Sequence, residues 1–586
     1  MGPAYASRGL VADCQRWVNM ALEKIDSGNG ASNGVPFQAF NTPGKQLLVT
    51  LGDSPVCCVS PSNNAAYFFD TVLFFVQSGA TLYAIKATLD GSNWVGTADI
   101  IGTGIVTQAI TGTGGQLFPS QIIPITPELI FVVSAGAAYV AAYGSALSTS
   151  TLAGAGAAYA VGDTGTIDSG KIPAQYIVTS IDGSGGVTGY TITYAGTGYA
   201  VADVPNGTAG GDQPGVGTGF SVTITAVAAA AWLVQQQTIP EGTLITDNFI
   251  RSCTWMDGYV IVSLAPTADD PARRRFYISG LLAPTRWNAL DFSTKESNSD
   301  PVIRVFAAYE VLIVFGSQTI ELWQDTGDVL NTFQRIAGGG VIENGLVSAW
   351  AVSKMDGTVC WLGSDARGQY VAWQLRGTTP VRISNHAIEN AWSQYDTAGA
   401  TSYPYTENGH FFWVLHFPIP DKTWVYDSSI GPALGWHERE FWDGAASHAD
   451  IGRYHAFFPE IGHCVGDYRN GNLYLQSLQF LQDNCAAIRR IRVTPHIVTD
   501  LRWNFFDKYR LHCLTGRVPA TGDGSDPVCT IEISNDGGQS YGSLLTRSMG
   551  QTGDYRRVIE WLRMGRARDR VVRWTCSEPI DIVLVD

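Results

Sequence analysis

Residues 309–323 read YEVLIVFGSQTIELW. Two apolar runs flank a short polar turn, which is the pattern of an antiparallel β-hairpin. Units of the same form, each with Gly, Asn or Asp at the turn, begin near six further positions: Asp70, Pro127, Met256, Met355, Glu407 and Ile451. The sequence therefore predicts a fold assembled from repeated hairpins.

The spacing of these units indicates their architecture. Successive starts differ by 57, 129, 53, 46, 52 and 44 residues, and all but one of these intervals approach the length of a four-stranded propeller blade. We therefore predict an all-β chain with a β-propeller of about six to seven blades. A β-sandwich with unrelated hairpins is the alternative. The polar stretch LLAPTRWNALDFSTKESNSDP, residues 281–301, is predicted to connect one blade to the next.

The long interval indicates an insertion. Residues 144–226 contain 18 glycines, no tryptophan, no cysteine and one basic residue, Lys171, whereas all 17 tryptophans lie elsewhere. Removing this stretch restores the period. Its short β-type runs, separated by Gly-rich turns, predict a small β domain that projects from a blade loop.

The pattern changes again near residue 487, where an antiparallel β-sandwich is predicted. The sequence thus predicts four parts. Residues 1–60 form an N-terminal crossing with the first strands, and residues 61–143 and 227–486 form the propeller. Residues 144–226 form the inserted Gly-rich domain, and residues 487–586 form the C-terminal sandwich.

Composition agrees with the all-β class and limits the function. Charged residues make up only 15% of the 586 residues, with 65 glycines and 11% aromatic residues, a balance typical of short strands and tight turns. The net charge of −15 argues against tight wrapping of nucleic acid. The last hundred residues are the exception, with 15 basic and 12 acidic side chains.

Ten cysteines occur without any Cys-x-x-Cys pair, so buried free thiols and folding in a reducing cytoplasm are expected. The longest apolar run, nine residues from Ala226, is too short to span a bilayer. The N-terminus lacks the apolar segment that a secretion signal needs.

We find no sequence motif for catalysis, and we expect no enzyme activity, metal or cofactor. Phosphate-binding loops, zinc-protease motifs and nucleophile elbows are all missing. Four histidines, at 437, 448, 455 and 463, have no metal-site spacing. Residues Ser534–Tyr541 fit the Asp-containing turn of sialidase propellers, but such a turn is structural and occurs here once.

Arginines are concentrated near the C-terminus. Arg563, Arg566, Arg568 and Arg570 are candidates for a contact with DNA or a neighbouring subunit, and in strand geometry Arg566, Arg568 and Arg570 share one face. A solvated strand face is the alternative explanation.

The chain resembles the packaged-DNA stabilisation proteins, or tail nozzle proteins, of short-tailed phages. The resemblance runs through several segments in order: CQRWVNMALEK, FNTPGKQLLV, VLIVFGSQTIELWQDTG, FQRIAGGGVIENG, PVRISNHAIENAW, TWVYDSSIGPALGWHERE and MGRARDRVVRW. The insertion at 144–226 departs from this pattern.

The resemblance implies a structural virion protein, assembled in the host cytoplasm and located in the tail. It implies a homo-hexameric nozzle below the portal or adaptor ring, with tail spikes, fibres or a needle as further partners. Packaged double-stranded DNA would pass through its channel and be retained. A glycan-binding or glycan-cleaving propeller of a tail or secreted protein is the alternative function.

Overall fold

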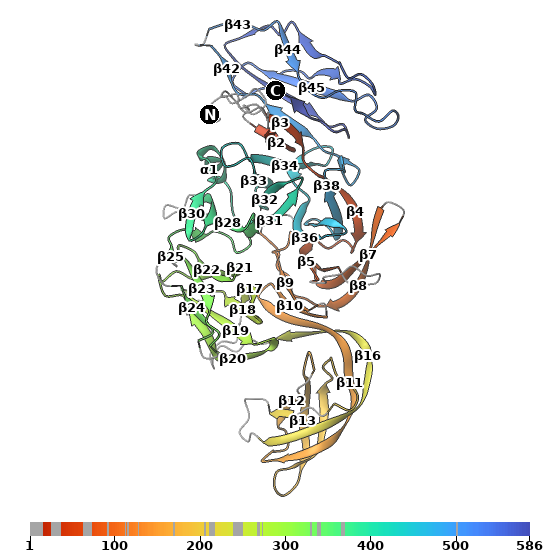
Figure 1. The fold of residues 1–586 in the computed structure, drawn as a ribbon, viewed down its shortest axis with the longest axis vertical. Helices are drawn as coiled ribbons and strands as arrows, with labels where there is room; N and C mark the ends of the chain where they lie inside the picture. Colours follow the sequence, from red (N-terminus) through yellow and green to blue (C-terminus); the bar gives the residue numbers. More distant parts are fainter. Residues whose placement is uncertain are drawn as a thin grey trace.

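The computed structural model describes residues 16–24, 37–62, 73–90, 93–111, 113, 116–126, 128–167, 170–203, 207–209, 217–237, 250–266, 270–271, 273–328, 331–336, 341–364, 370–499 and 502–585. In these ranges the chain contains one short helix, α1 (His386–Trp392), and otherwise strands and turns. A propeller lies at the centre, with the C-terminal domain and the insertion at opposite edges (Figure 1). The all-β class and the propeller are thus confirmed.

The propeller has seven blades in the described part of the chain, each built on four antiparallel strands. Blade 1 contains β5 (Val56–Pro61), β6 (Phe74–Ser78), β7 (Thr81–Asp90) and β8 (Asn93–Thr103). Blade 2 contains β9 (Gln121–Thr126), β10 (Leu129–Ser134), β11 (Ala137–Ala157) and β16 (Thr218–Gln237). Blade 3 contains β17 (Ile250–Met256), β18 (Tyr259–Leu264), β19 (Arg275–Gly280) and β20 (Ala283–Thr294).

The remaining blades follow the same plan. Blade 4 contains β21 (Val302–Ala308), β22 (Val311–Gly316), β23 (Ile320–Asp325) and β24 (Phe333–Arg335), and β25 (Val341–Ile342) also pairs with β23. Blade 5 contains β27 (Val352–Met355), β28 (Thr358–Ser364), β29 (Tyr370–Arg376) and β30 (Thr379–Arg382), and β26 (Gly345–Leu346) also pairs with β28. Blade 6 contains β31 (Thr401–Glu407), β32 (His410–Phe417), β33 (Lys422–Asp427) and β34 (Trp436–Trp442), and β35 (Ser447–Ala449) also pairs with β34. Blade 7 contains β36 (Gly452–Phe458), β37 (Gly462–Asp467), β38 (Asn472–Ser477) and β4 (Gly44–Thr50).

The hydrophobic core of the propeller lies between its blades. Seven separate clusters of buried residues each join two neighbouring blades, including the pair formed by blades 7 and 1. A strand in the middle of a blade therefore buries both of its faces, as β10 and β22 do almost throughout. This explains why the hairpins of the sequence read as continuous apolar runs, since strict alternation requires one solvated face.

The predicted connection at 281–301 is mostly wrong. Residues Ala283–Thr294 form β20, the outer strand of blade 3, and only the following residues cross to blade 4. Several side chains of β20 are exposed, with Leu290 at 79%. An outer strand has one unpaired edge and packs against few neighbours, so its sequence carries polar residues and resembles a loop.

The N-terminal part of the chain closes the ring. Strand β4 pairs antiparallel with β38, from Asn472↔Thr50 to Ser477↔Gly44, and is the fourth strand of blade 7. Strand β5, which follows it, begins blade 1. The structure therefore differs from the predicted division at residue 60, because this segment supplies strands to two blades.

A buried ionic cluster fixes this closing strand. Lys45 of β4 is 3% exposed, and its ammonium lies 2.5 Å from Asp450 Oδ1 and 3.1 Å from Asp483 Oδ1. Asp483 belongs to the short strand β39 (Gln482–Asp483), which pairs with β4 and with β40 (Ala486–Ala487). Burial acts to lower the pKa of Lys45, but the two carboxylates outweigh it and raise that pKa. One cation thus ties the closing strand to blade 7 and to the segment that leaves it.

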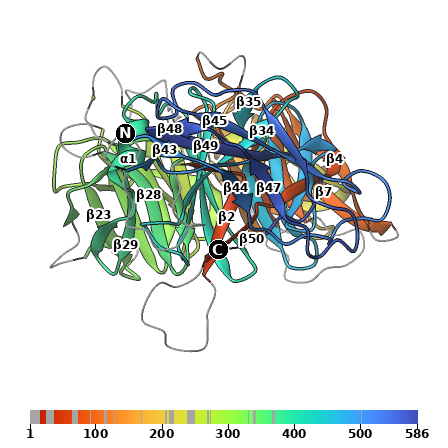
Figure 2. The same ribbon diagram turned by 90° about the horizontal axis from the view of Figure 1, so that it is seen from above.

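The C-terminal domain is a β-sandwich that includes the N-terminal strands. It contains β1 (Arg16–Val18), β2 (Met20–Lys24), β3 (Phe37–Asn41), β41 (Arg490–Val493), β42 (Ile497–Val498), β43 (Asn504–Phe505), β44 (Lys508–Leu511), β45 (Val528–Ser534), β46 (Leu545–Ser548), β47 (Ile559–Leu562), β48 (Arg566–Ala567), β49 (Asp569–Cys576) and β50 (Leu584–Val585). Seen from above, β45 and β49 lie in front of the propeller (Figure 2). Trp17 and Met20 share the core of this domain with Trp561 and Trp574.

Strand β1 joins this domain to the propeller. It pairs parallel with β34 of blade 6 and antiparallel with β41, so one sheet runs from the blade into the sandwich. Arg16 donates two hydrogen bonds to the Glu438 carboxylate, at 2.7 and 2.8 Å, and one to Glu440 at 2.6 Å. Asn19, with φ of 55°, donates to the carbonyls of Glu440 and Arg489. Asparagine tolerates this left-handed conformation better than most residues.

The inserted domain is attached to blade 2 through two of its strands, which extend beyond the blade. Strands β11 and β16 extend beyond the blade as a long antiparallel ribbon whose register shifts at four points. Beyond the ribbon lies a second sheet, formed by β12 (Thr164–Ile167), β13 (Ala174–Ile181), β14 (Val187–Tyr194) and β15 (Gly207–Ala209). A separate core packs the two together, with the ring centres of Tyr176 and Phe220 4.6 Å apart and the rings tilted by 35°.

Replacing Lys45 by Met should destabilise the protein strongly. The variant leaves Asp483 buried without a cation and Asp450 with only Arg439, at 3.9 Å, and removal of one partner of such a cluster costs about 3–5 kcal/mol. Unfolding by urea measures this loss. The matched variant Lys86→Met removes a partly exposed ion pair with Asp99, which contributes about 0–1 kcal/mol. Equal midpoints for the two variants would contradict a structural role for the buried cluster.

Deleting residues 146–229 and joining Ser145 to Ala230 through Asn-Gly should leave a folded propeller. Ser145 and Ala230 face each other in the ribbon, and a two-residue Asn-Gly turn suits such a pair. The expected result is a monodisperse β-rich protein with an unfolding midpoint near that of the full chain, measured by circular dichroism. Aggregation of this variant would show that the inserted domain is needed for folding of the propeller.

Candidate functional site

The predicted arginines do not share one face. Arg566 and Arg568 are exposed, and their guanidinium carbons lie 4.7 and 5.0 Å from the ring centre of Trp503. Arg570 is only 3% exposed, so its assignment as a surface contact is wrong. It donates to the Met564 carbonyl at 2.7 Å and to Asn535 Oδ1, and it stacks on Phe506.

The alternation of exposed and buried side chains along Arg566–Arg570 is interrupted where one strand ends and the next begins. Arg566 belongs to β48, which pairs with β43, whereas Arg570 belongs to β49, where it pairs with β42. The change of partner at Arg568 interrupts the alternation of faces, and both Arg570 and Val571 are buried. Arg563 is exposed in a turn with φ of 58°.

The exposed arginines belong to a surface that also presents apolar side chains. Strand pairing places Phe505 opposite Arg566, Ile497 opposite Arg570 and Val498 opposite Asp569. We define the Trp503 patch as Ile497, Val498, Trp503, Phe505, Arg566 and Arg568. Phe505 is 78% exposed and Trp503 is 49% exposed. Exposed aromatic residues beside arginines are typical of protein interfaces.

Exposed apolar residues are concentrated in this domain. Of the 26 large apolar side chains exposed in the described residues, 11 lie between Ile497 and Leu562. Of these, strand pairing brings Ile497, Val498 and Phe505 beside the arginines, and a contiguous exposed apolar patch is typical of an interaction surface.

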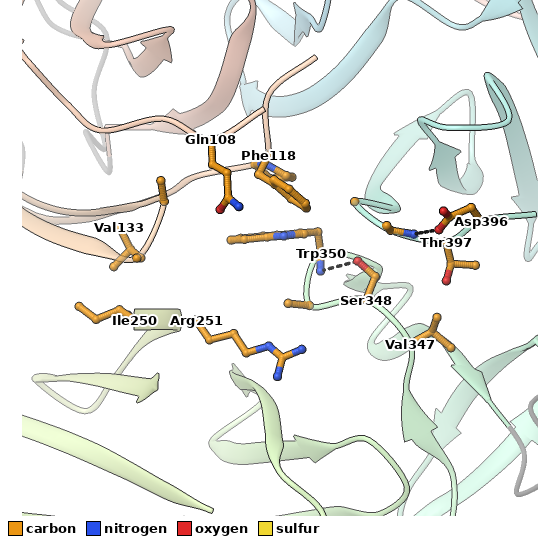
Figure 3. A pocket seen from close by; sticks show the side chains of 16 residues that line it. Gln108, Phe118, Val133, Ile250, Arg251, Val347, Ser348, Trp350, Asp396 and Thr397 are labelled. Atoms are coloured by element: carbon orange, nitrogen blue, oxygen red, sulfur yellow. Dashed lines mark hydrogen bonds between the residues drawn. The ribbon is translucent and has the colours of Figure 1, made fainter. Parts of the chain in front are cut away.

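The centre of the propeller contains two adjoining cavities. The outer one, of about 510 Å³, is lined by loops of several blades, and the indole of Trp350 lies between Phe118 and Arg251 (Figure 3). The inner one, of about 250 Å³, is lined by the inner strands of blades 1, 2, 4, 5, 6 and 7. Pro119 and Trp350 line both cavities.

Two arginines, Arg304 and Arg453, line the inner cavity, and no carboxylate does so among the described residues. Our sequence reasoning missed them. The sequence does contain a sign of them, because a single arginine interrupts each of two largely apolar strands. Arg304 lies in VIRVFAA and Arg453 lies in GRYHAFF. Strand alternation alone does not show whether such a residue points toward the axis of a propeller or toward a neighbouring blade.

The four histidines considered as metal ligands have separate environments. His437 is buried, His448 contacts Asp421 and Asp443, and only His455 and His463 meet, at 2.9 Å between ring nitrogens. The described ranges contain no group of three or more His, Cys, Asp or Glu side chains that could hold a metal ion.

The turn Ser534–Tyr541 is a local hydrogen-bond network. Asp536 accepts hydrogen bonds from the Ser534 and Ser540 side chains and from the backbone of Gln539 and Ser540. These bonds lower the pKa of its carboxyl. The turn lies between β45 and β46, far from the propeller axis (Figure 1). No described helix has the length and apolar character needed to cross a membrane.

The fold and its surfaces define a structural class: a seven-bladed propeller with two added β domains and an exposed aromatic and arginine patch. Residues 199–478 match the family described as "Bacteriophage P22 Gp10, beta-propeller". This match supports a phage structural protein of the tail and DNA stabilisation kind.

Comparisons beyond the family are distant. No curated protein sequence matches the chain. Hsv2 of Kluyveromyces lactis is 9% identical with a TM-score of 0.24, over 66% of this chain and 97% of Hsv2. A glycoside hydrolase family 43 arabinoxylan arabinofuranohydrolase from Bacillus subtilis is 8% identical with a TM-score of 0.23, over 73% of this chain and 95% of the hydrolase.

Acid should destabilise the protein through buried histidines of blade 6. Burial lowers the pKa of His416 to about 3, helped by nearby Arg453, and holds the pKa of His437 well below its usual value. Below about pH 6.5 the unfolded chain binds protons that the folded chain does not, so stability falls as the pH falls, by about 1.4 kcal/mol per pH unit for each histidine.

The variant His416→Asn should reduce this slope by one histidine's share. The Asn side chain can still accept a hydrogen bond from Thr423, which lies 2.8 Å from His416 Nδ1. Urea unfolding at pH 7, 6 and 5 measures the slope. His386→Asn, at a position where the side chain is 91% exposed, is the control. An unchanged slope in His416→Asn would contradict the buried-neutral assignment.

Proposed function

We propose that this protein forms a hexameric tail nozzle below the portal and adaptor rings, extends the DNA channel and helps retain the packaged genome. The observation that carries the proposal is the family match over residues 199–478, which cover most of the propeller. The protein would be assembled in the host cytoplasm and located in the virion tail.

The charge distribution supports a ring. Residues before 487 carry 22 basic and 40 acidic side chains, whereas the last hundred carry 15 and 12. Opposite charges on different parts of one chain favour head-to-tail contacts, and such contacts close into rings when the rotation permits. The Trp503 patch is the surface we assign to one side of that contact, with a neighbouring subunit or a portal or adaptor ring opposite it.

An acidic body also suits a conduit. Phosphates adsorb to clusters of Lys and Arg, and a surface with an excess of carboxylates repels them at distances within the Debye length of about 8 Å. DNA would therefore pass such a surface without binding to it. Tail spikes, fibres or a needle are the further partners we propose.

We propose no catalytic role. Cleavage of glycosides generally requires a pair of carboxyl groups on either side of the bond. The inner cavity of the propeller is instead lined by arginines, hydroxyls and apolar groups among the described residues, and the outer cavity contributes one carboxylate, Asp396. The alternative of a glycan-cleaving propeller has no comparable support.

Particles that lack this protein should package DNA and then lose it. Filled heads and released DNA are counted by electron microscopy and nuclease sensitivity at successive times after packaging. Native mass spectrometry of detached tails should give six copies per portal. Heads that stay filled without the protein would refute the proposed role in genome retention.

The double variant Arg566→Ala and Arg568→Ala should lower incorporation into particles, and its difference from the wild type should shrink at high salt, which screens the same charges. Both side chains are exposed, and truncation of central Arg or Trp contacts weakens interfaces by about 2 kcal/mol or more. Trp503→Ala should act in the same direction. The copies per particle are measured by quantitative mass spectrometry.

The matched control is Arg556→Ala with Arg557→Ala. It removes two exposed arginines of the same domain outside the patch, and it should leave incorporation unchanged. Equal incorporation of the patch variants and this control would show that the Trp503 patch is not an assembly surface.

A further inference from the structure

The inner cavity of the propeller has the chemistry of a buried anion site. Its wall is formed by inner strands, including β21 with Arg304, β36 with Arg453 and β31 with Thr401 and Tyr403. These strands lie around the axis, so their polar groups approach the same space from different blades (Figure 1).

Neither arginine forms an ion pair in the described structure. Arg453 is 1% exposed, donates through Nη2 to Gln116 Oε1 at 2.7 Å and lies over the Tyr468 ring at 4.2 Å. Its Nε and Nη1 atoms are buried, and the neutral Tyr454 hydroxyl beside the guanidinium supplies no charge to balance it.

Arg304, on the other side of the cavity, also lacks an ion-pair partner among the described residues. Its Nη1 donates to the Ala349 carbonyl, its Nε has no acceptor, and the guanidinium lies against Phe306 and Trp350. Burial lowers the pKa of Arg304 to about 10, and the acidic groups that act on it are the thiols of Cys253 and Cys58. A buried cation without a counterion is costly, and proteins usually satisfy it with an anion.

Buried hydroxyls complete the set of donors. Ser120 and Thr401 line the same cavity, and neither Ser120 Oγ nor Thr401 Oγ1 has a hydrogen-bond partner among the described residues. Buried polar groups are nearly always hydrogen-bonded to protein, water or ligand. Unsatisfied donors that come from blades 2, 4, 6 and 7 therefore surround one space.

We propose that this cavity binds a tetrahedral oxyanion of the inorganic phosphate class. Donors on several sides match the four oxygens of a tetrahedral anion better than a planar carboxylate, and arginine binds phosphate oxygens through charge-assisted hydrogen bonds. The volume of about 250 Å³ accommodates such an anion together with several water molecules.

The adjoining outer cavity supplies a route to solvent. It shares Pro119 and Trp350 with the inner cavity, and Asp396 and Ala398 on its wall are exposed. The bound anion would add a contact between inner strands of blades that are not neighbours in the ring. The site thus stabilises the propeller, independently of the proposed role in the tail.

Calorimetric titration of the full chain with inorganic phosphate tests the proposal. The reference is chloride at equal ionic strength, with sulfate and acetate as further ligands. We expect saturable binding of phosphate and sulfate, with a higher unfolding midpoint than in chloride, because a ligand bound only by the folded state stabilises it. Acetate should bind more weakly.

Two cavity variants identify the site. Arg304→Met removes one cation and should weaken phosphate binding by about tenfold or more, as expected for loss of a charged hydrogen bond. In chloride it should keep or raise the unfolding midpoint, because an unpaired buried cation is removed. Thr401→Val keeps the side-chain shape and should weaken phosphate binding by a smaller factor.

The matched control is Arg335→Met, at an exposed position of blade 4, which should leave phosphate binding unchanged. A short DNA duplex should not compete with phosphate, because a cavity of about 250 Å³ is too small to admit a duplex. Three results would each overturn the proposal: no saturable phosphate binding, equal binding by the wild type and Arg304→Met, or acetate binding as tight as phosphate. Competition by the duplex would assign the arginines to DNA phosphates instead.

Discussion

The structure depends on closure of the propeller by a strand from the opposite end of the chain. Residues 44–50 pair with β38, and Lys45 carries the only charge that β4 places between Asp450 and Asp483. Without this strand blade 7 would have three strands and an open edge beside blade 1. Ring closure is a long-range event with a large entropic cost, so it requires a strong and specific contact. A buried cation between two carboxylates provides specificity, because a shifted register would leave Lys45 and Asp483 unpaired and Asp450 with Arg439 alone, at 3.9 Å.

The same N-terminal segment couples the propeller to the C-terminal domain. Arg16 and Asn19 bind the outer strand of blade 6, while Trp17 and Met20 enter the core of the sandwich. A domain joined only by a linker could rotate freely. Here a continuous sheet and a shared core hold the Trp503 patch in a defined direction relative to the blades. An assembly protein needs this property, because the contacts of each subunit in a ring must recur at a fixed angle.

Three parts of the structure are spatially separate. The C-terminal domain and the inserted domain project from opposite edges of the propeller (Figure 1), which leaves them available to different neighbours. The axis of the propeller is lined by arginines and hydroxyls and holds no catalytic pair of carboxylates among the described residues. In this protein the propeller serves as a rigid frame, and the added β domains supply most of the exposed side chains suited to contacts.

The sequence by itself determined the hairpins, their period and the class of the protein, because these depend on local turn chemistry and on apolar runs such as 311–316. It also marked the insertion by composition. The tertiary structure alone decided which polar stretch becomes an outer strand, as in β20, and that residues 44–50 complete the last blade. It also turned Arg570 inward, through a change of strand partner at Arg568, and directed Arg304 and Arg453 into one cavity. Pairing partners and distances around the propeller axis arise from contacts between residues far apart in the chain, and local patterns carry no information about them.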